Sequence, residues 1–140
     1  MARELACTFA QSIAEDGFFE GIDAVIPVPL HRLKQMKRGY NQSRAIAEGI
    51  EKATGIPVAD NLKCSRAHKS QTRLGMADRW LNTRDIFSVS APEELEGKHV
   101  LIVDDVITTG STLTACCRAV HGAVSHVRTS VLTLGIDMLS

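Results

Sequence analysis

The stretch of sequence that decides the fold runs from Val100 to Leu113 and reads VLIVDDVITTGSTL. It begins with a run of aliphatic residues and continues into two adjacent acids, Asp104 and Asp105. A short, uninterrupted apolar run is typical of a strand that is buried on both faces, as in a parallel sheet. We therefore expect a buried strand over His99–Asp104, with both acids at the carboxyl edge of the sheet, where open α/β sheets bind their ligands.

A turn rich in hydroxyl groups follows the acid pair. It consists of Thr108, Thr109, Gly110, Ser111 and Thr112. We expect a helix over Ser111–Val120, so the turn leads into a helix N-terminus, whose N–H groups and dipole favour a phosphate. Gly110 permits an unusual backbone angle and the close approach of a ligand. Because two acids suit a diol or a metal ion, the whole stretch is suited to a sugar phosphate.

Other interpretations of this stretch fit less well. An ordinary helix cap with solvated acids does not explain why strand, acid pair, turn and helix occur in this order. A Walker phosphate loop requires Gly-Lys followed by Ser or Thr, which does not occur here. A phospho-receiver domain needs a further Asp and a later Lys, but the chain after Asp105 holds no lysine and a single acid, Asp137.

The elements around this stretch alternate between strands and helices. Leu5, Phe9 and Ile13 recur every four residues, which predicts a short amphipathic helix. The apolar run Ala24–Pro29 predicts a buried strand that its prolines must end, and Gln42–Ala53 predicts a helix. Weaker patterns predict strands over Leu62–Ser65, Ile86–Val89 and Val127–Leu134 and a turn over Glu94–Gly97. This order implies right-handed crossovers and an α/β fold with a mostly parallel, twisted sheet flanked by helices.

Composition narrows the class of protein. The 140 residues are 44% hydrophobic and 23% charged, which is the balance of one globular domain spanning residues 1–140. The formal net charge of zero argues against a protein that binds polyanions with its whole surface. The longest aliphatic run is too short to span a bilayer, and the N-terminus lacks a signal-peptide pattern. We therefore expect a cytoplasmic protein with no membrane partner.

The zero net charge hides two basic segments, one within residues 31–44 and one within residues 63–84. Their basic residues are Arg32, Lys34, Lys37, Arg38, Arg44, Lys63, Arg66, Lys69, Arg73, Arg79 and Arg84. Each segment alone fits a solvated face, but together, beside a phosphate-type turn, they favour a pocket for a highly anionic small molecule. Single-stranded nucleic acid stays open as a ligand, although few aromatic rings are present for base stacking. The long polar segment 66–85 fits a functional lid or a disordered insertion.

The cysteines suggest packing rather than metal binding. Cys7, Cys64, Cys116 and Cys117 show no CxxC or CxxH spacing, which argues against a zinc ribbon. We expect four reduced thiols that serve as small apolar side chains.

With these motifs in place, the sequence resembles the type I phosphoribosyltransferases, and within them the ComF/GntX group, which is linked at family level to DNA uptake in competence. The resemblance is carried by Pro27-Val28-Pro29-Leu30-His31, by Arg38-Gly39-Tyr40-Asn41-Gln42, by Gln71 with Arg79 and Asn82, and by residues 100–113. Two features depart from the family pattern. The cysteine-rich zinc segment usual in the group does not precede Met1, and Thr108 stands where purine-salvage relatives place an Asp base.

The resemblance implies a type I phosphoribosyltransferase fold with a flexible lid over about residues 66–85, and a substrate, 5-phosphoribosyl-1-diphosphate (PRPP). Thr108–Thr112 would hold its 5-phosphate, while Asp104 and Asp105 would take the ribose hydroxyls and steady the positive charge that develops at C1. The residues expected to meet the diphosphate are Arg32 and Arg38 after the first strand and Lys69, Arg73 and Arg79 in the lid. Mg²⁺ would be bound mostly through substrate oxygens and water, with the two aspartates as its candidate protein ligands.

A second hypothesis also follows from the resemblance: a non-catalytic module that senses PRPP or binds DNA or a protein of the competence machinery. The absence of an Asp base at position 108 motivates it. The acceptor of a phosphoribosyl group is not encoded by any recognisable pattern in residues 27–41, and a homodimer stays open.

Overall fold

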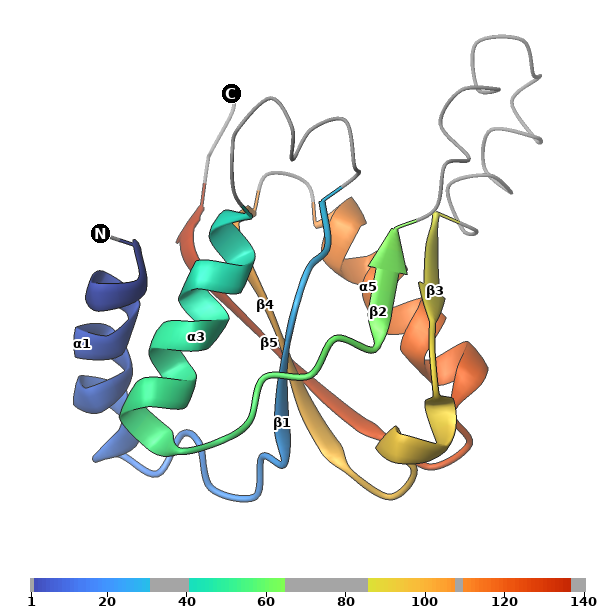
Figure 1. Cartoon of the computed structure of the whole chain (residues 1–140), viewed down its shortest axis with the longest axis horizontal. Helices are drawn as coiled ribbons and strands as arrows, with labels where there is room; N and C mark the ends of the chain where they lie inside the picture. Colours follow the sequence, from blue (N-terminus) through green and yellow to red (C-terminus); the bar gives the residue numbers. More distant parts are fainter. Residues whose placement is uncertain (1, 31–40, 65–85, 108–109, 137–140) are drawn as a thin grey trace, which may run out of the picture.

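The computed structural model describes residues 2–30, 41–64, 86–107 and 110–136 (Figure 1). Its elements, in chain order, are α1 (Ala2–Ala14), β1 (Ala24–Pro27), α3 (Gln42–Thr54), β2 (Leu62–Cys64), β3 (Phe87–Val89), the 3₁₀ helix η2 (Pro92–Leu95), β4 (His99–Ile107), α5 (Ser111–Ala123) and β5 (Arg128–Ile136). The alternation of strands and helices predicted from the sequence is confirmed. The basic segment 31–40 and the predicted lid 66–85 lie outside the described residues.

The central sheet is parallel and has the strand order β1-β4-β5. Its middle strand holds Val100–Val103, and each of these four side chains is 0% exposed. The strands β1 and β5 flank this run, and side chains pack against it on both faces of the sheet. This burial on all sides explains its uninterrupted apolar sequence. A separate antiparallel pair is formed by β2 and β3. The predicted α/β fold with a parallel sheet flanked by helices is therefore confirmed.

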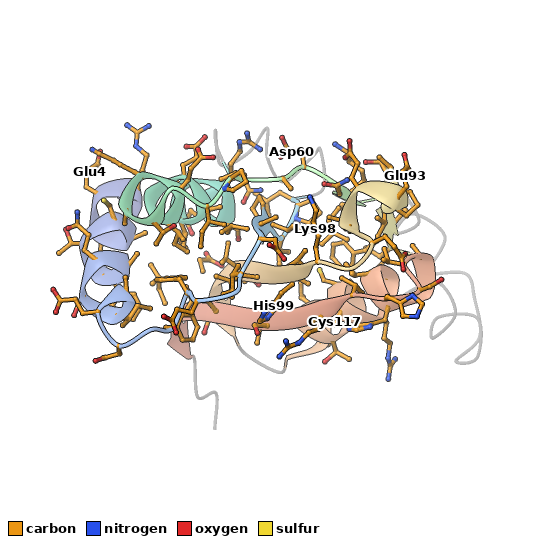
Figure 2. All side chains as sticks on the ribbon, turned by 90° about the horizontal axis from the view of Figure 1, so that it is seen from below. Glu4, Asp60, Glu93, Lys98, His99 and Cys117 are labelled. Atoms are coloured by element: carbon orange, nitrogen blue, oxygen red, sulfur yellow. The ribbon has the colours of Figure 1, made fainter. Side chains whose placement is uncertain are left out.

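Helices cover the two faces of the sheet through two separate apolar clusters. On one face, Val25, Leu101 and Val103 pack with side chains of α1 and α3. On the other face, Val100 and Ile102 pack with α5 and with residues of the β2–β3 side. Side chains fill the space between strands and helices on both sides (Figure 2). Alternate residues of one strand thus serve two different cores, as the two-residue period of a strand requires.

The central strand is longer than predicted. The sequence predicts a strand over His99–Asp104, whereas β4 runs on to Ile107. Pairing with β5 explains the difference, because Val106 and Ile107 are still in register with Gly135 and Ile136. On the other side of β4 the pairing with β1 ends earlier, where Pro27 meets Val103. The acid pair therefore lies within β4 but beyond the last residue of β1, so no residue of β1 pairs with it.

The first helix exists as predicted, but its buried face differs. Leu5 and Phe9 are 61% and 41% exposed, while Ala6 and Ala10 are each 1% exposed. The reason is the close approach of α1 to α3: a Cβ atom built on Gly49 would lie 2.9 Å from the Ala6 Cβ. Only small residues fit between helices this close, so Leu5 and Phe9 face outward. The predicted amphipathic helix thus exists, but of Leu5, Phe9 and Ile13 it is Ile13 that packs against the core.

Three further features of the described residues can be compared with the sequence: the predicted turn over Glu94–Gly97, the length of the helices and the cysteines. The predicted turn over Glu94–Gly97 overlaps the end of η2, whose Leu95 is buried in the core, so only its last two residues form a turn. Within the described ranges, no helix is both long and apolar enough to cross a membrane. The four cysteines form no disulfide with one another; Cys7 and Cys116 are buried, as expected of small apolar side chains, whereas Cys64 and Cys117 are half-buried.

Candidate functional site

The candidate site lies at the carboxyl edge of the parallel sheet. Figure 1 shows the carboxyl ends of β1 and β4 and the N-terminal ends of α3 and α5 together at the top of the molecule. Two helix N-termini bring positive partial charge to this edge. Asp104 lies on β4 just beyond the end of β1. It is therefore at the edge of the sheet where helix N-termini supply N–H donors for an anion or a polar ligand.

Asp104 is held by two hydrogen bonds to one of its oxygens. The Ser43 hydroxyl donates to Asp104 Oδ1 at 2.9 Å, and the backbone N–H of Asp105 donates to the same oxygen at 2.9 Å. Burial raises the pKa of Asp104 above its ordinary value, and the adjacent Asp105 carboxyl adds to this rise, although the two hydrogen bonds act against it. The carboxylate is thus partly desolvated and fixed in direction before any ligand arrives.

The Ser43 hydroxyl is placed by the cap of α3. Asn41 is the N-cap residue, and its Oδ1 accepts from the Ser43 backbone N–H at 3.0 Å. The Asn41 Nδ2 group donates to the Val28 carbonyl just beyond β1, at 3.1 Å. The sequence predicts Asn41 both as part of a family motif and as part of a turn that caps the helix, but it does not predict a role for Ser43. The local signal was an Asn cap two residues before a serine in the first turn, but the partner is 61 residues away in sequence.

The described part of the predicted phosphate-binding turn, residues 110–112, follows β4. Gly110 caps α5 in the left-handed conformation, with φ of +80°, as the expectation of an unusual backbone angle required. Its carbonyl accepts the first helical hydrogen bond, from the Thr114 N–H at 2.9 Å. Ser111 and Thr112 are exposed in the first turn of α5. Thr108 and Thr109 lie outside the described residues.

The five residues predicted to contact the diphosphate lie outside the described ranges. These residues are Arg32, Arg38, Lys69, Arg73 and Arg79. Of the basic residues counted in the first segment, Arg44 lies on α3 and is bound by Asp60 and by Glu48. Asp60 is labelled in Figure 2. Arg44 is therefore engaged in holding α3 to the segment before β2.

A buried thiol lies near Asp104. Cys116 of α5 is in the core, and burial raises the pKa of its thiol, to which the electrostatic influence of Cys117 and Asp104 adds. A thiol held in its neutral form is a poor nucleophile. The chemistry of this edge therefore rests on carboxylates, hydroxyls and backbone N–H groups.

We expect the variant Asp104→Asn to stabilise the protein at neutral pH. Because the folded-state pKa of Asp104 is raised, the charged carboxylate costs folding free energy above that pKa. This cost is absent below the ordinary pKa of an aspartate and develops as the pH rises through the folded-state pKa. Urea denaturation should show a gain of about 1 kcal/mol for the variant at neutral pH and none at about pH 3. An equal effect at both pH values would contradict this explanation.

The fold and this edge together define the class: an α/β protein whose parallel sheet gathers its polar residues at the carboxyl ends of the strands. The model of the phosphoribosyl transferase domain matches residues 5–134, and the chain belongs to this family. The predicted resemblance to type I phosphoribosyltransferases is thereby confirmed.

Named relatives point to the same group. The chain is 38% identical over 94 residues to competence protein F of Haemophilus influenzae, a match that covers 65% of this chain and 41% of that protein. It is 32% identical over 92 residues to the DNA utilization protein YhgH of Escherichia coli, covering 65% of this chain and 40% of the relative. The matched region thus spans about two fifths of the length of these curated relatives.

A solved structure supports the fold. The glutamine PRPP amidotransferase of B. subtilis, complexed with ADP and GMP, superposes with a TM-score of 0.61 at 24% identity. The match covers 92% of this chain and 26% of the amidotransferase chain. At this level of identity the likeness concerns the path of the backbone.

Proposed function

We propose that this protein binds PRPP at the carboxyl edge of its sheet and transfers the phosphoribosyl group to an acceptor, releasing diphosphate. The observation that carries the proposal is the Asp104 carboxylate, which Ser43 fixes directly after the buried run Val100–Val103 of β4, the strand followed by left-handed Gly110 and α5. Membership of the phosphoribosyl transferase domain family supports it. The proposed domain is the whole of residues 1–140.

The predicted site residues divide the substrate between them. Residues 108–112 hold the 5-phosphate, because first-turn N–H groups of an α-helix have no carbonyl partner within the helix. Asp104 and Asp105 take the ribose hydroxyls. As diphosphate leaves, positive charge develops on the sugar, and fixed carboxylates stabilise it without having to reorient.

The acid pair also fits Mg²⁺. A closed metal site would need three or more His, Cys, Asp or Glu side chains close together, and the described ranges contain no such group. Mg²⁺ instead commonly binds through one or two carboxylates and completes its shell with substrate phosphates and water. Asp104 and Asp105 are two adjacent, half-buried carboxylates of this kind. When bound, the ion supplies positive charge that neutralises the diphosphate.

The two basic segments complete the proposed site. Arg32 and Arg38 meet the diphosphate, and residues 66–85 close over it as a lid. Lys69, Arg73 and Arg79 in the lid neutralise the leaving group and exclude water. This part of the proposal rests on the sequence and on the family, because these residues lie outside the described ranges.

Binding of PRPP tests the proposal directly. Isothermal titration of the protein with PRPP and Mg²⁺ should give one site per chain, and a set of candidate nucleobases should include one that triggers release of diphosphate. No heat of binding from the intact protein would contradict the proposed function.

A second candidate is a PRPP-binding module without turnover that serves DNA uptake. The names of the relatives, competence protein F and DNA utilization protein, favour it. Binding of PRPP without diphosphate release for any acceptor would support the module. The affinity for single-stranded DNA, measured against salt concentration, should then fall steeply if phosphates are bound. Acceptor-dependent release of diphosphate would exclude a purely non-catalytic role.

A further inference from the structure

Ser43 stands out among the buried polar side chains. The described residues bury two of them, Ser43 at 4% exposure and Asn61 at 6%. Asn61 is accounted for by the fold, because its Nδ2 group donates to the Ser90 carbonyl and to the Glu94 side chain of η2. The Ser43 hydroxyl instead donates to Asp104, an acid at the candidate site. A buried hydroxyl aimed at a half-buried carboxylate is a strong, directed contact.

We propose that Ser43 is a positioning residue of this site: it holds Asp104 in the orientation that receives the ribose of PRPP, and Asn41 in turn holds Ser43. The inference rests on the proposed function, and it adds two residues that act through Asp104 rather than by touching the substrate.

The geometry of the contact restricts the carboxylate. Two donors, the Ser43 hydroxyl and the Asp105 N–H, converge on the same oxygen from different elements. The Asp105 N–H is part of β4, whereas Ser43 belongs to α3. Rotation of the Asp104 side chain therefore breaks at least the contact to Ser43. A carboxylate restrained in this way needs less reorganisation when the substrate binds.

Asn41 extends the chain of contacts to β1. Its side chain caps Ser43 with one atom and binds the Val28 carbonyl with the other. Val28 and Asn41 flank the segment that contains Arg32 and Arg38, the residues proposed for the diphosphate. The chain Val28–Asn41–Ser43–Asp104 therefore connects the ends of that segment to the acid pair.

Three variants test the role of Ser43. Ser43→Ala removes the donor, Ser43→Thr keeps a hydroxyl, and Thr54→Val removes a hydroxyl bond at the far end of the same helix, where Thr54 Oγ1 donates to the Ile50 carbonyl. We expect Ser43→Ala to weaken binding of PRPP with Mg²⁺ about tenfold or more. Ser43→Thr should recover most of the affinity, and Thr54→Val should bind as the parent protein does. Equal affinity of Ser43→Ala and the parent would overturn the proposal.

A second measurement separates this inference from the proposed function. Crystal structures of Ser43→Ala and Ser43→Thr without ligand should show the Asp104 carboxylate rotated in the first and retained in the second. An unmoved Asp104 in Ser43→Ala overturns the positioning role, whatever the protein binds. Failure of the parent protein to bind PRPP, with Asp104 rotated in Ser43→Ala, refutes the proposed function and with it the ribose as the group received.

Discussion

The double variant Asp104→Asn, Asp105→Asn is expected to fold and to lose all measurable release of diphosphate from PRPP. The carboxylates are the only groups that we assign to the positive charge developing on the ribose, and amides of the same shape cannot neutralise it. Removal of one fixed electrostatic contact at a reacting centre typically costs about 10²–10³ in turnover. Loss of both should therefore place the variant near the background rate. The assay is diphosphate release with PRPP, Mg²⁺ and the acceptor identified by screening.

A matched control removes a carboxylate from the opposite edge of the same sheet. Asp23 Oδ2 accepts a hydrogen bond from the backbone N–H of His99, at the start of β4. Asp23→Asn should leave turnover unchanged, because this edge lies at the amino ends of the strands. The double variant should also unfold in one cooperative thermal transition, at or above the temperature of the parent protein, which separates lost activity from lost fold. Full activity of the double variant would refute the mechanism.

Gly49→Ala is expected to be the most destabilising small substitution in the described part of the chain. A Cβ atom at this position would lie 2.4 Å from the Arg3 carbonyl oxygen, 2.9 Å from the Ala6 Cβ and 2.9 Å from the Cys7 backbone nitrogen. Two of these atoms belong to the backbone of α1, so no side-chain rotation relieves the overlap and the two helices must separate. We expect a loss of about 3 kcal/mol in the free energy of unfolding. Urea denaturation measures it.

Gly122 provides the matched control for this substitution. It also lies in a helix, α5, but a Cβ atom there would meet nothing within 4 Å. Alanine is the better helix former by about 0.8–1.0 kcal/mol, so Gly122→Ala should raise the free energy of unfolding. The two substitutions should therefore change the free energy of unfolding in opposite directions. The difference between the two changes isolates the contact between α1 and α3. Similar effects at both positions would mean that the close approach is not maintained in solution.

The exposed apolar side chains of α1 follow from the same contact. Apolar spacing in the sequence selected Leu5 and Phe9 as the core face, since periodicity weighs large apolar residues most. The actual core face is marked by alanines, and its cause is a glycine on another helix. No rule applied to α1 alone contains this information, because the distance between two helices depends on the side chains of both.

The candidate site divides along the same line. Asp104, Asp105 and Gly110 were placed correctly along the chain, at the end of the buried run and ahead of the next helix. The hydrogen bond from Ser43 was not foreseen, because it joins residues 61 positions apart. The extent of β4 was underestimated for a related reason, namely that its last residues are held by pairing with β5.

Sequence alone therefore determined the features that depend on neighbours along the chain: the buried run Val100–Val103, the acids after it, the glycine that turns into α5 and the start of α3 at Gln42. Tertiary structure alone decided which face of α1 is buried, how far β4 extends and which hydroxyl holds Asp104. The physical reason is range. Backbone preferences and apolar spacing act over a few residues, whereas close packing and directed hydrogen bonds join atoms that only the folded chain brings together.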